Sequence, residues 1–279
     1  MAAGPVHLIE AGIVTEQRYA GAGTAPAALG GALAERLGPA KRVKIPFNPR
    51  DRWLTAARES CRTLADAVTA SMAAHALPVV VGGECTLVAG TITGALAIER
   101  DLALVYFDAH GDFNTLATTP SHYVGGMCLA HVCGRHVAPL LWPGVRTISD
   151  DNVALAGARQ LDSGEARNLD GSRVRRIRFD AEHPEAPGLL AFARRRQVWV
   201  HIDVDVVDPA DMPAVASPVS GGPSLSALAE LLREIAAVSD VRGIEICGYD
   251  PTKDATARLV APLADLMAAA VLGPALARR

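Results

Sequence analysis

Short apolar runs of strand length, separated by longer segments with helical periodicity, constrain the fold of this chain more than any other feature. The runs lie at residues 6–14, 43–45, 78–81, 102–107, 197–204 and 241–246. Helical patterns cover residues 25–37, 53–76 and 87–99, and Ser224 is placed to cap a further helix. Strands that alternate with helices of ten or more residues predict an α/β fold, with a mostly parallel central sheet and helices on both sides.

No linker rich in Pro, Ser or Gly divides the sequence, and no block of charge does so either. We therefore expect residues 1–279 to form a single domain, which is within the usual range for α/β folds. Hydrophobic residues make up 50% of the chain and aromatic residues only 4%, so the core should be mainly aliphatic.

Charge and composition exclude several classes of partner. The net charge is −3, so nothing indicates a nucleic acid or an anionic membrane as a partner. The most apolar late segment, residues 266–277, is shorter than the ~20 residues that a membrane span needs, and the N-terminus lacks a signal-peptide pattern. Five cysteines, an odd number scattered over a large chain, indicate reduced thiols. We therefore expect a cytoplasmic protein with no membrane partner.

Polar clusters follow two of the predicted strands. Asp108, His110 and Asp112 occupy every second position after residues 102–107, as an extended strand leaving a buried sheet would present them. Asp203 and Asp205 alternate with apolar neighbours at the end of the next long run. Each residue alone is more typical of a cap or a turn. The alternation predicts a strand through Asp205, so that its carboxylate shares a face with that of Asp203 about 7 Å away along the strand, and such buried carboxylates need a cation. Together the clusters predict a site for two divalent ions such as Mn²⁺.

Three segments resemble the signatures of the arginase/agmatinase (ureohydrolase) family. They are residues 82–86 (GGECT), 108–114 (DAHGDFN) and 201–209 (HIDVDVVDP), and residues 213–218 are similar to the family segment that follows the third. The resemblance implies a three-layer αβα sandwich, a centre of two Mn²⁺ per chain, and hydrolysis of linear amidines with release of a urea.

The resemblance also implies a role for each matching residue. Asp108 and Asp203 would bridge the ions and hold the hydroxide that attacks the guanidine carbon, so they are the expected catalytic residues. Cys85 and Asp112 would complete the first metal position, and His110 and Asp205 the second. The expected substrate contacts are Asn114, Thr119 and Ser121 for the α-carboxylate and Asp162 and Glu165 near the α-amino group. This set implies a small-molecule amino-acid substrate rather than decarboxylated agmatine.

Three positions depart from the family pattern. Cys85 stands where the family has a His ligand, and it is either a softer ligand or an inert buried thiol. Gly125 replaces a His that shuttles protons, and Gly248 stands where a Glu that pairs with the guanidinium is expected. His122 is either a partial replacement for the shuttle or an ordinary loop residue. Loss of the two side chains is expected to leave room for an additional substrate oxygen.

These departures favour a hydroxylated guanidine, which is less basic and can bind as a neutral group. The combination of Cys85 with Gly125 resembles the branch of the family that hydrolyses Nω-hydroxy-L-arginine to hydroxyurea and L-ornithine in the antibiotic pathway to D-cycloserine. We expect that reaction. The alternatives are an arginase or other guanidino-acid ureohydrolase with a modified metal site, and a catalytically inert metal-binding relative. The chain stops soon after its last expected helix, which favours a monomer over a homo-oligomer.

Overall fold

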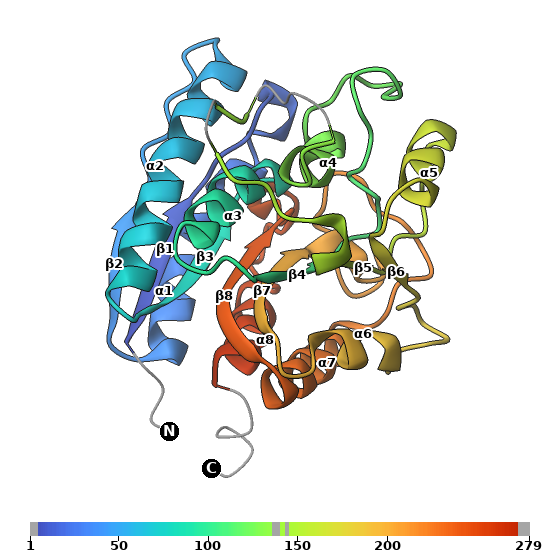
Figure 1. Ribbon diagram of the computed structural model, residues 1–279. Helices are drawn as coiled ribbons and strands as arrows, with labels where there is room; N and C mark the ends of the chain where they lie inside the picture. The colour runs from blue at the N-terminus through green and yellow to red at the C-terminus, as the bar shows by residue number, and fades with distance from the viewer. Residues whose placement is uncertain (1–4, 136–139, 143–144, 273–279) are drawn as a thin grey trace.

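The computed structural model describes residues 5–135, 140–142 and 145–272. Its strands form one sheet in the order β2-β1-β3-β8-β7-β4-β5-β6, in which every neighbouring pair is parallel (Figure 1). The strands are β1 (Val6–Ala11), β2 (Ala40–Lys44), β3 (Leu77–Gly82), β4 (Ala103–Phe107), β5 (Val153–Ala156), β6 (Arg175–Ile177), β7 (Gln197–Asp203) and β8 (Asp240–Cys247). The predicted α/β fold with a parallel central sheet is therefore confirmed.

Helices cover both faces of this sheet and complete a three-layer αβα sandwich (Figure 1). One face packs against α1 (Ala25–Leu37), α6 (Pro187–Ala193), α7 (Leu225–Val238) and α8 (Val260–Leu272). The other face packs against α2 (Trp53–Ala73), α3 (Val88–Leu96), α4 (Cys128–Val132) and α5 (Ser163–Asp170). Each layer buries its own aliphatic cluster against the sheet, as the composition predicts.

Most of the predicted elements are present with small shifts at their ends. The helix at residues 25–37 is confirmed at both ends, and the Ser224 side chain accepts a hydrogen bond from the Ala227 backbone N–H at 3.1 Å, so it caps α7 as expected. The segment at residues 266–277 belongs to α8 as far as Leu272, and its remainder lies outside the described residues. Within the described part of the chain, no helix has the length and apolar character to cross a bilayer.

Two strands, β5 and β6, were not predicted from the sequence. Both are short, and β6 is an edge strand whose Arg175 and Arg176 are exposed. Long apolar runs predict buried strands, and an edge strand with basic side chains lacks that signal. The two strands extend the sheet beyond β4 and so complete one wall of its carboxyl edge.

A register shift between β7 and β8 decides which residues meet at the carboxyl edge of the sheet. The pairing skips Arg242, so that Trp199 lies opposite Gly243 and Asp203 consequently lies opposite Cys247. A Cβ atom at Gly243 would overlap the Trp199 ring. The glycine therefore permits the indole to pack at the position where the register changes.

Candidate metal centre and substrate pocket

A cavity of about 330 Å³ opens at the carboxyl ends of the central strands, which is where ligands bind in open α/β sheets. Its walls come from the end of β7, from the segments that follow β3, β4, β5, β7 and β8, and from the 3₁₀ turns that contain Tyr19 and Ala22. The predicted site residues among its lining are Cys85, Asp108, His110, Asp112, Asn114, Ser121, Asp162, Glu165, Asp203 and Asp205, and Gly125 and Gly248 also line it. The structure therefore brings together all the predicted metal ligands and four of the five predicted substrate contacts.

The first part of the site is built by the loop that follows β4. Asp108 is 1% exposed, and its Oδ1 atom accepts a hydrogen bond from the His110 backbone N–H at 2.6 Å. The His110 Nδ1 atom lies 3.3 Å from Asp108 Oδ1 and 3.1 Å from Asp205 Oδ2. These three side chains thus form one compact group of possible metal ligands.

The second part comes from the end of β7, and here the predicted strand geometry is wrong. The strand ends at Asp203, and Asp205 lies in the 3₁₀ turn Val204–Val206, so the two carboxylates do not share a strand face. Instead, Asp203 Oδ1 accepts a hydrogen bond from the Asp205 backbone N–H at 2.9 Å, and Asp205 Oδ1 accepts one from Ala109 at 3.1 Å. Both carboxylates nevertheless line the cavity.

The loop that follows β4 likewise departs from an extended strand. β4 ends at Phe107, and Asp112 adopts a left-handed backbone with φ of +49°. Its Oδ2 atom accepts hydrogen bonds from the Tyr106 hydroxyl at 2.7 Å and from the Cys128 thiol at 3.1 Å. Among the described residues, Asp112 therefore lines the cavity but stands apart from the compact ligand groups.

Cys85 lies at the start of the 3₁₀ turn Cys85–Leu87, directly after β3. Its thiol donates to Asp203 Oδ2 at 2.9 Å and lies 3.8 Å from Asp108 Oδ2. Cys85, Asp108 and Asp203 form a second compact group, which shares Asp108 with the group that contains His110. This is the adjacency that two ions with a common carboxylate ligand would require.

The electrostatics of the site fit a cation. Burial, together with repulsion from a neighbouring carboxylate, raises the pKa of Asp203 and of Asp205 to about 6. Burial alone would lower the pKa of His110, but its hydrogen bonds to Asp108 and Asp205 outweigh this and raise the pKa to about 11. A buried set of carboxylates that resists ionisation is stabilised by divalent cations, and O and N donors suit ions such as Mn²⁺.

The predicted substrate contacts lie mostly at the start of α5. Asp162 is the N-cap residue, and Glu165 accepts hydrogen bonds from the Asp162 backbone N–H at 3.2 Å and from Phe113 at 2.8 Å. Asn114 donates to Asp162 Oδ2 at 2.9 Å. Burial, opposed by those backbone hydrogen bonds, raises the pKa of Glu165 to about 7. Three of the predicted contacts therefore form one connected polar wall.

Thr119 differs from the other predicted contacts, because it does not line the cavity. It is buried, and its hydroxyl accepts a hydrogen bond from the His122 backbone N–H at 3.1 Å. His122 itself is exposed, has a left-handed φ of +57°, and is not among the residues that line the cavity. This placement favours the interpretation of His122 as an ordinary loop residue.

The two glycines that depart from the family pattern line the cavity, but at each of them the direction of a side chain is occupied. Room for the additional substrate oxygen stays a prediction. A Cβ atom at Gly125 would overlap the Tyr123 ring. Gly248 has φ of +82°, and a Cβ atom there would overlap the Asp203 carboxylate. Any larger residue at Gly248 would therefore require backbone strain as well as displacement of Asp203.

Sequence reasoning missed Tyr123, which forms the wall beside Gly125. Its hydroxyl donates to Glu84 Oε2 at 2.8 Å, and its ring packs against Tyr19 with centroids 4.6 Å apart. Glu84 Oε1 in turn accepts hydrogen bonds from Thr15 and Thr86. A signal was available, because Tyr123 lies between Ser121 and Gly125, two positions that the sequence analysis had singled out.

Comparisons with known proteins agree with this geometry. The protein-family model described as "Arginase family" matches residues 6–273 of this chain. An arginase of Bacillus caldovelox is 32% identical over 225 residues, which cover 75% of this chain and 74% of that protein. The N(omega)-hydroxy-L-arginine amidinohydrolase of Streptomyces lavendulae is 32% identical over 169 residues, which cover 59% of this chain and 59% of that protein. Among solved structures, an arginase from Bacillus cereus has a TM-score of 0.86 at 26% identity, over 96% of this chain and 98% of that one.

Proposed function

Because this chain belongs to the arginase family, we propose that it is a hydrolase of guanidino compounds that cleaves Nω-hydroxy-L-arginine to hydroxyurea and L-ornithine. Support for the amino-acid part of the substrate comes from the polar wall of Asn114, Asp162 and Glu165 beside the metal-ligand groups. The amide of Asn114 can donate to a carboxylate, and the two acidic side chains can accept from an ammonium group.

The proposed cofactor is a pair of Mn²⁺ ions. Cys85, Asp108, Asp112 and Asp203 would hold one ion, and His110 and Asp205, with the shared carboxylates, the other. When bound, such ions supply Lewis acidity and a water of lowered pKa as the nucleophile. The chain's own residues then have three tasks: Asp108 and Asp203 orient the nucleophile, the wall at α5 positions the amino-acid end, and the enclosing loops exclude bulk water.

Gly248 is the observation that carries the choice of a hydroxylated guanidine. Its left-handed backbone and its contact with Asp203 leave no room for a carboxylate side chain at this position. A cationic guanidinium would lack that partner. A hydroxyguanidine does not need it, because its lower pKa allows it to bind as a neutral group.

The two-substrate assay tests this proposal directly. With Mn²⁺ added, the purified protein should release L-ornithine from Nω-hydroxy-L-arginine at least ~100-fold faster, in kcat/KM, than from L-arginine, which corresponds to about 2.7 kcal/mol of transition-state discrimination. Hydroxyurea should appear in equal amount. A preference for L-arginine would overturn the choice of substrate and leave the assignment to the family intact.

An arginase with a modified metal site is the second candidate. The observation in its favour is that the Bacillus caldovelox arginase and the Streptomyces lavendulae amidinohydrolase are equally similar to this chain, at 32% identity. An inert relative is the third, and metal content separates it from the others: two Mn per chain support catalysis, whereas a chain that binds none supports the inert reading.

Several broader features remain predictions. They are a single catalytic domain over residues 1–279, a cytoplasmic location, a monomeric state and a role in antibiotic biosynthesis. Sedimentation of the purified protein at micromolar concentration tests the monomer, since a sedimenting mass near 29.1 kDa is expected.

A further inference from the structure

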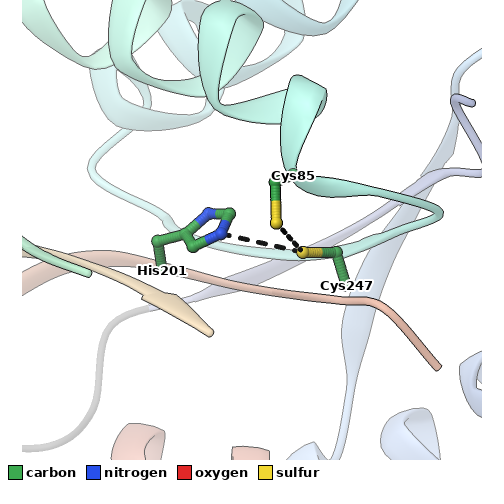
Figure 2. A group of neighbouring side chains, drawn as sticks. All are labelled: Cys85, His201 and Cys247. Carbon is green, nitrogen blue, oxygen red and sulfur yellow. Dashed lines mark hydrogen bonds between the residues drawn. The ribbon is translucent and has the colours of Figure 1, made fainter. Parts of the chain in front are cut away.

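Two thiols and an imidazole converge beside the carboxylate groups, and two of these three residues, His201 and Cys247, have no part in the proposed hydrolysis. Figure 2 shows Cys85, His201 and Cys247, from three different parts of the chain, pointing toward one another. The two Sγ atoms are 3.5 Å apart, and Cys247 Sγ lies 3.7 Å from His201 Nε2. All three ligand atoms lie within 4.8 Å of one another, and all three residues are buried.

These separations match the edges of a tetrahedral metal site. With Zn–S bonds of about 2.3 Å and Zn–N bonds of about 2.0–2.1 Å, tetrahedral geometry places two sulfurs about 3.8 Å apart and a sulfur and a nitrogen about 3.6 Å apart. The observed distances of 3.5 Å and 3.7 Å differ from these values by a few tenths of an ångström. The remaining pair of ligand atoms, from Cys85 and His201, lies within 4.8 Å, so side-chain movement along that edge would bring all three atoms into the coordination sphere of a single ion.

His201 is held in the orientation that such a site needs. Its Nδ1 atom is 2.6 Å from Glu245 Oε1, so Nε2 is the nitrogen that faces the sulfurs. Its ring stacks on Tyr106, with centroids 4.0 Å apart and an interplanar angle of 7°. A carboxylate on the far nitrogen is the usual support of a metal-binding histidine, because it fixes the tautomer and the direction of the lone pair.

We propose that Cys85, His201 and Cys247 form a second metal site, selective for one soft or borderline divalent ion such as Zn²⁺. Two thiolates and one imidazole are the donors that Zn²⁺ prefers, whereas Asp108, His110 and Asp205 present a harder donor set. Binding releases the two thiol protons to solvent. The ion reaches the site through the cavity, which Cys85 lines and which the other two residues do not reach.

Cys85 connects this site to the carboxylates. Its Sγ atom lies between Asp203 Oδ2, at 2.9 Å, and Cys247 Sγ, at 3.5 Å. A zinc ion bound by the three residues would draw Cys85 away from the group that it forms with Asp108 and Asp203. Zn²⁺ is therefore expected to lower the affinity of the neighbouring position for Mn²⁺.

Cobalt substitution tests the site without any use of hydrolytic activity, so its failure and the failure of the proposed function are separate results. The full-length protein is reduced, stripped of metal by a chelator and titrated with Co²⁺. We expect one equivalent to give intense visible bands of tetrahedral cobalt and thiolate-to-cobalt charge transfer in the near ultraviolet, and Zn²⁺ to abolish both. Cys247→Ser should lose about half of the charge-transfer intensity, since only a thiolate gives rise to it.

Two further variants complete the design. Glu245→Gln should weaken Zn²⁺ binding about 10–100-fold while it keeps two thiolates, and the matched control Cys133→Ser, a cysteine outside the group, should bind as the wild type does. X-ray absorption on the zinc-loaded wild type needs no variant, and it should show two sulfur ligands at about 2.3 Å. A zinc shell without sulfur, a charge-transfer band that Cys247→Ser does not change, or loss of both free thiols to a disulfide in the stripped protein would each overturn the proposal.

Discussion

The candidate metal ligands form two sides, a hard side and a soft side, which differ in donor chemistry and in the elements that hold them. On the hard side, Asp108, His110 and Asp205 offer oxygen and nitrogen ligands on turns beyond the strand ends, and His110 is partly exposed to the cavity. On the soft side, His201 and Cys247 lie on the strands themselves and are completely buried. Cys85 lies between the two. The comparison shows that Cys85, which stands where the family pattern has a histidine, contacts both the carboxylates and the second thiol.

The largest effect is expected from Asp108→Asn, because Asp108 belongs to both groups that contain cavity-facing carboxylates. The substitution should reduce kcat about 10³-fold or more, or about 4 kcal/mol, and should reduce the Mn content. Steady-state kinetics and elemental analysis measure the two changes.

The matched control for this prediction is Asp180→Asn, because Asp180 forms a similar group with Glu182 and His183 but none of the three lines the cavity. It should leave kinetics and Mn content unchanged. If Asp108→Asn retained full activity, the hard side would not be the catalytic side, and the comparison would fail.

The next effect is expected from Gly248→Ala. A left-handed backbone costs a non-glycine residue about 1–2 kcal/mol, and the added methyl group would also push against Asp203, so the free energy of unfolding should fall by about 3 kcal/mol. Urea denaturation of the metal-free protein measures this loss.

Gly126→Ala is the control for that change, because Gly126 lines the same cavity and has no atom within 4 Å of an added Cβ. Its free energy of unfolding should stay within about 0.5 kcal/mol of the wild type. Equal losses in the two variants would remove the argument that Gly248 is constrained by Asp203.

A smaller effect is expected from Glu165→Gln, and it depends on pH. The pKa of Glu165 is raised from 4.5 to about 7 in the folded protein, so the unfolded chain loses its proton first and the folded state is penalised as the pH rises from 4.5 to about 7. Across this window, the free energy of unfolding of the wild type should fall by about 2 kcal/mol more than that of the variant. This figure allows for solvent in the cavity. Parallel stability curves for the two metal-free proteins would contradict this.

The smallest effect tests whether Cys85 acts as a ligand on both sides. Cys85→His replaces the shared thiol by the imidazole that the family pattern expects, so Mn²⁺ affinity should rise about tenfold, or 1.4 kcal/mol. The same variant should lose half of the cobalt–thiolate absorption. An unchanged Mn²⁺ affinity would indicate that Cys85 is inert toward the hard side.

Sequence reasoning could predict the residues of the hard side because they lie in unbroken segments that follow apolar strands. It could not predict their geometry. Asp205 and Asp112 were expected on extended strands, but a 3₁₀ turn and a left-handed residue place them instead. Turn geometry depends on tertiary hydrogen bonds, such as the one from Ala109 to Asp205, which join segments almost a hundred residues apart.

The soft side was predicted only in part. His201 belongs to residues 201–209, a segment that the sequence singles out, but Cys247 had no assigned role, because its approach to Cys85 and His201 depends on how two strands are aligned. No periodicity within one strand reveals its register with a neighbour. Tyr123 was missed for a similar reason, since its role depends on contact with Glu84 from another loop.

The bulge at Arg242 determines which residue of β8 lies opposite Asp203. If the strands paired without this bulge, Asp203 would lie opposite Ile246 rather than Cys247, because a slip of one residue turns every side chain of a strand to the opposite face. A slip of β8 by one residue relative to β7, even one that begins remote from the cavity, would thus replace a sulfur by a hydrocarbon beside the carboxylates.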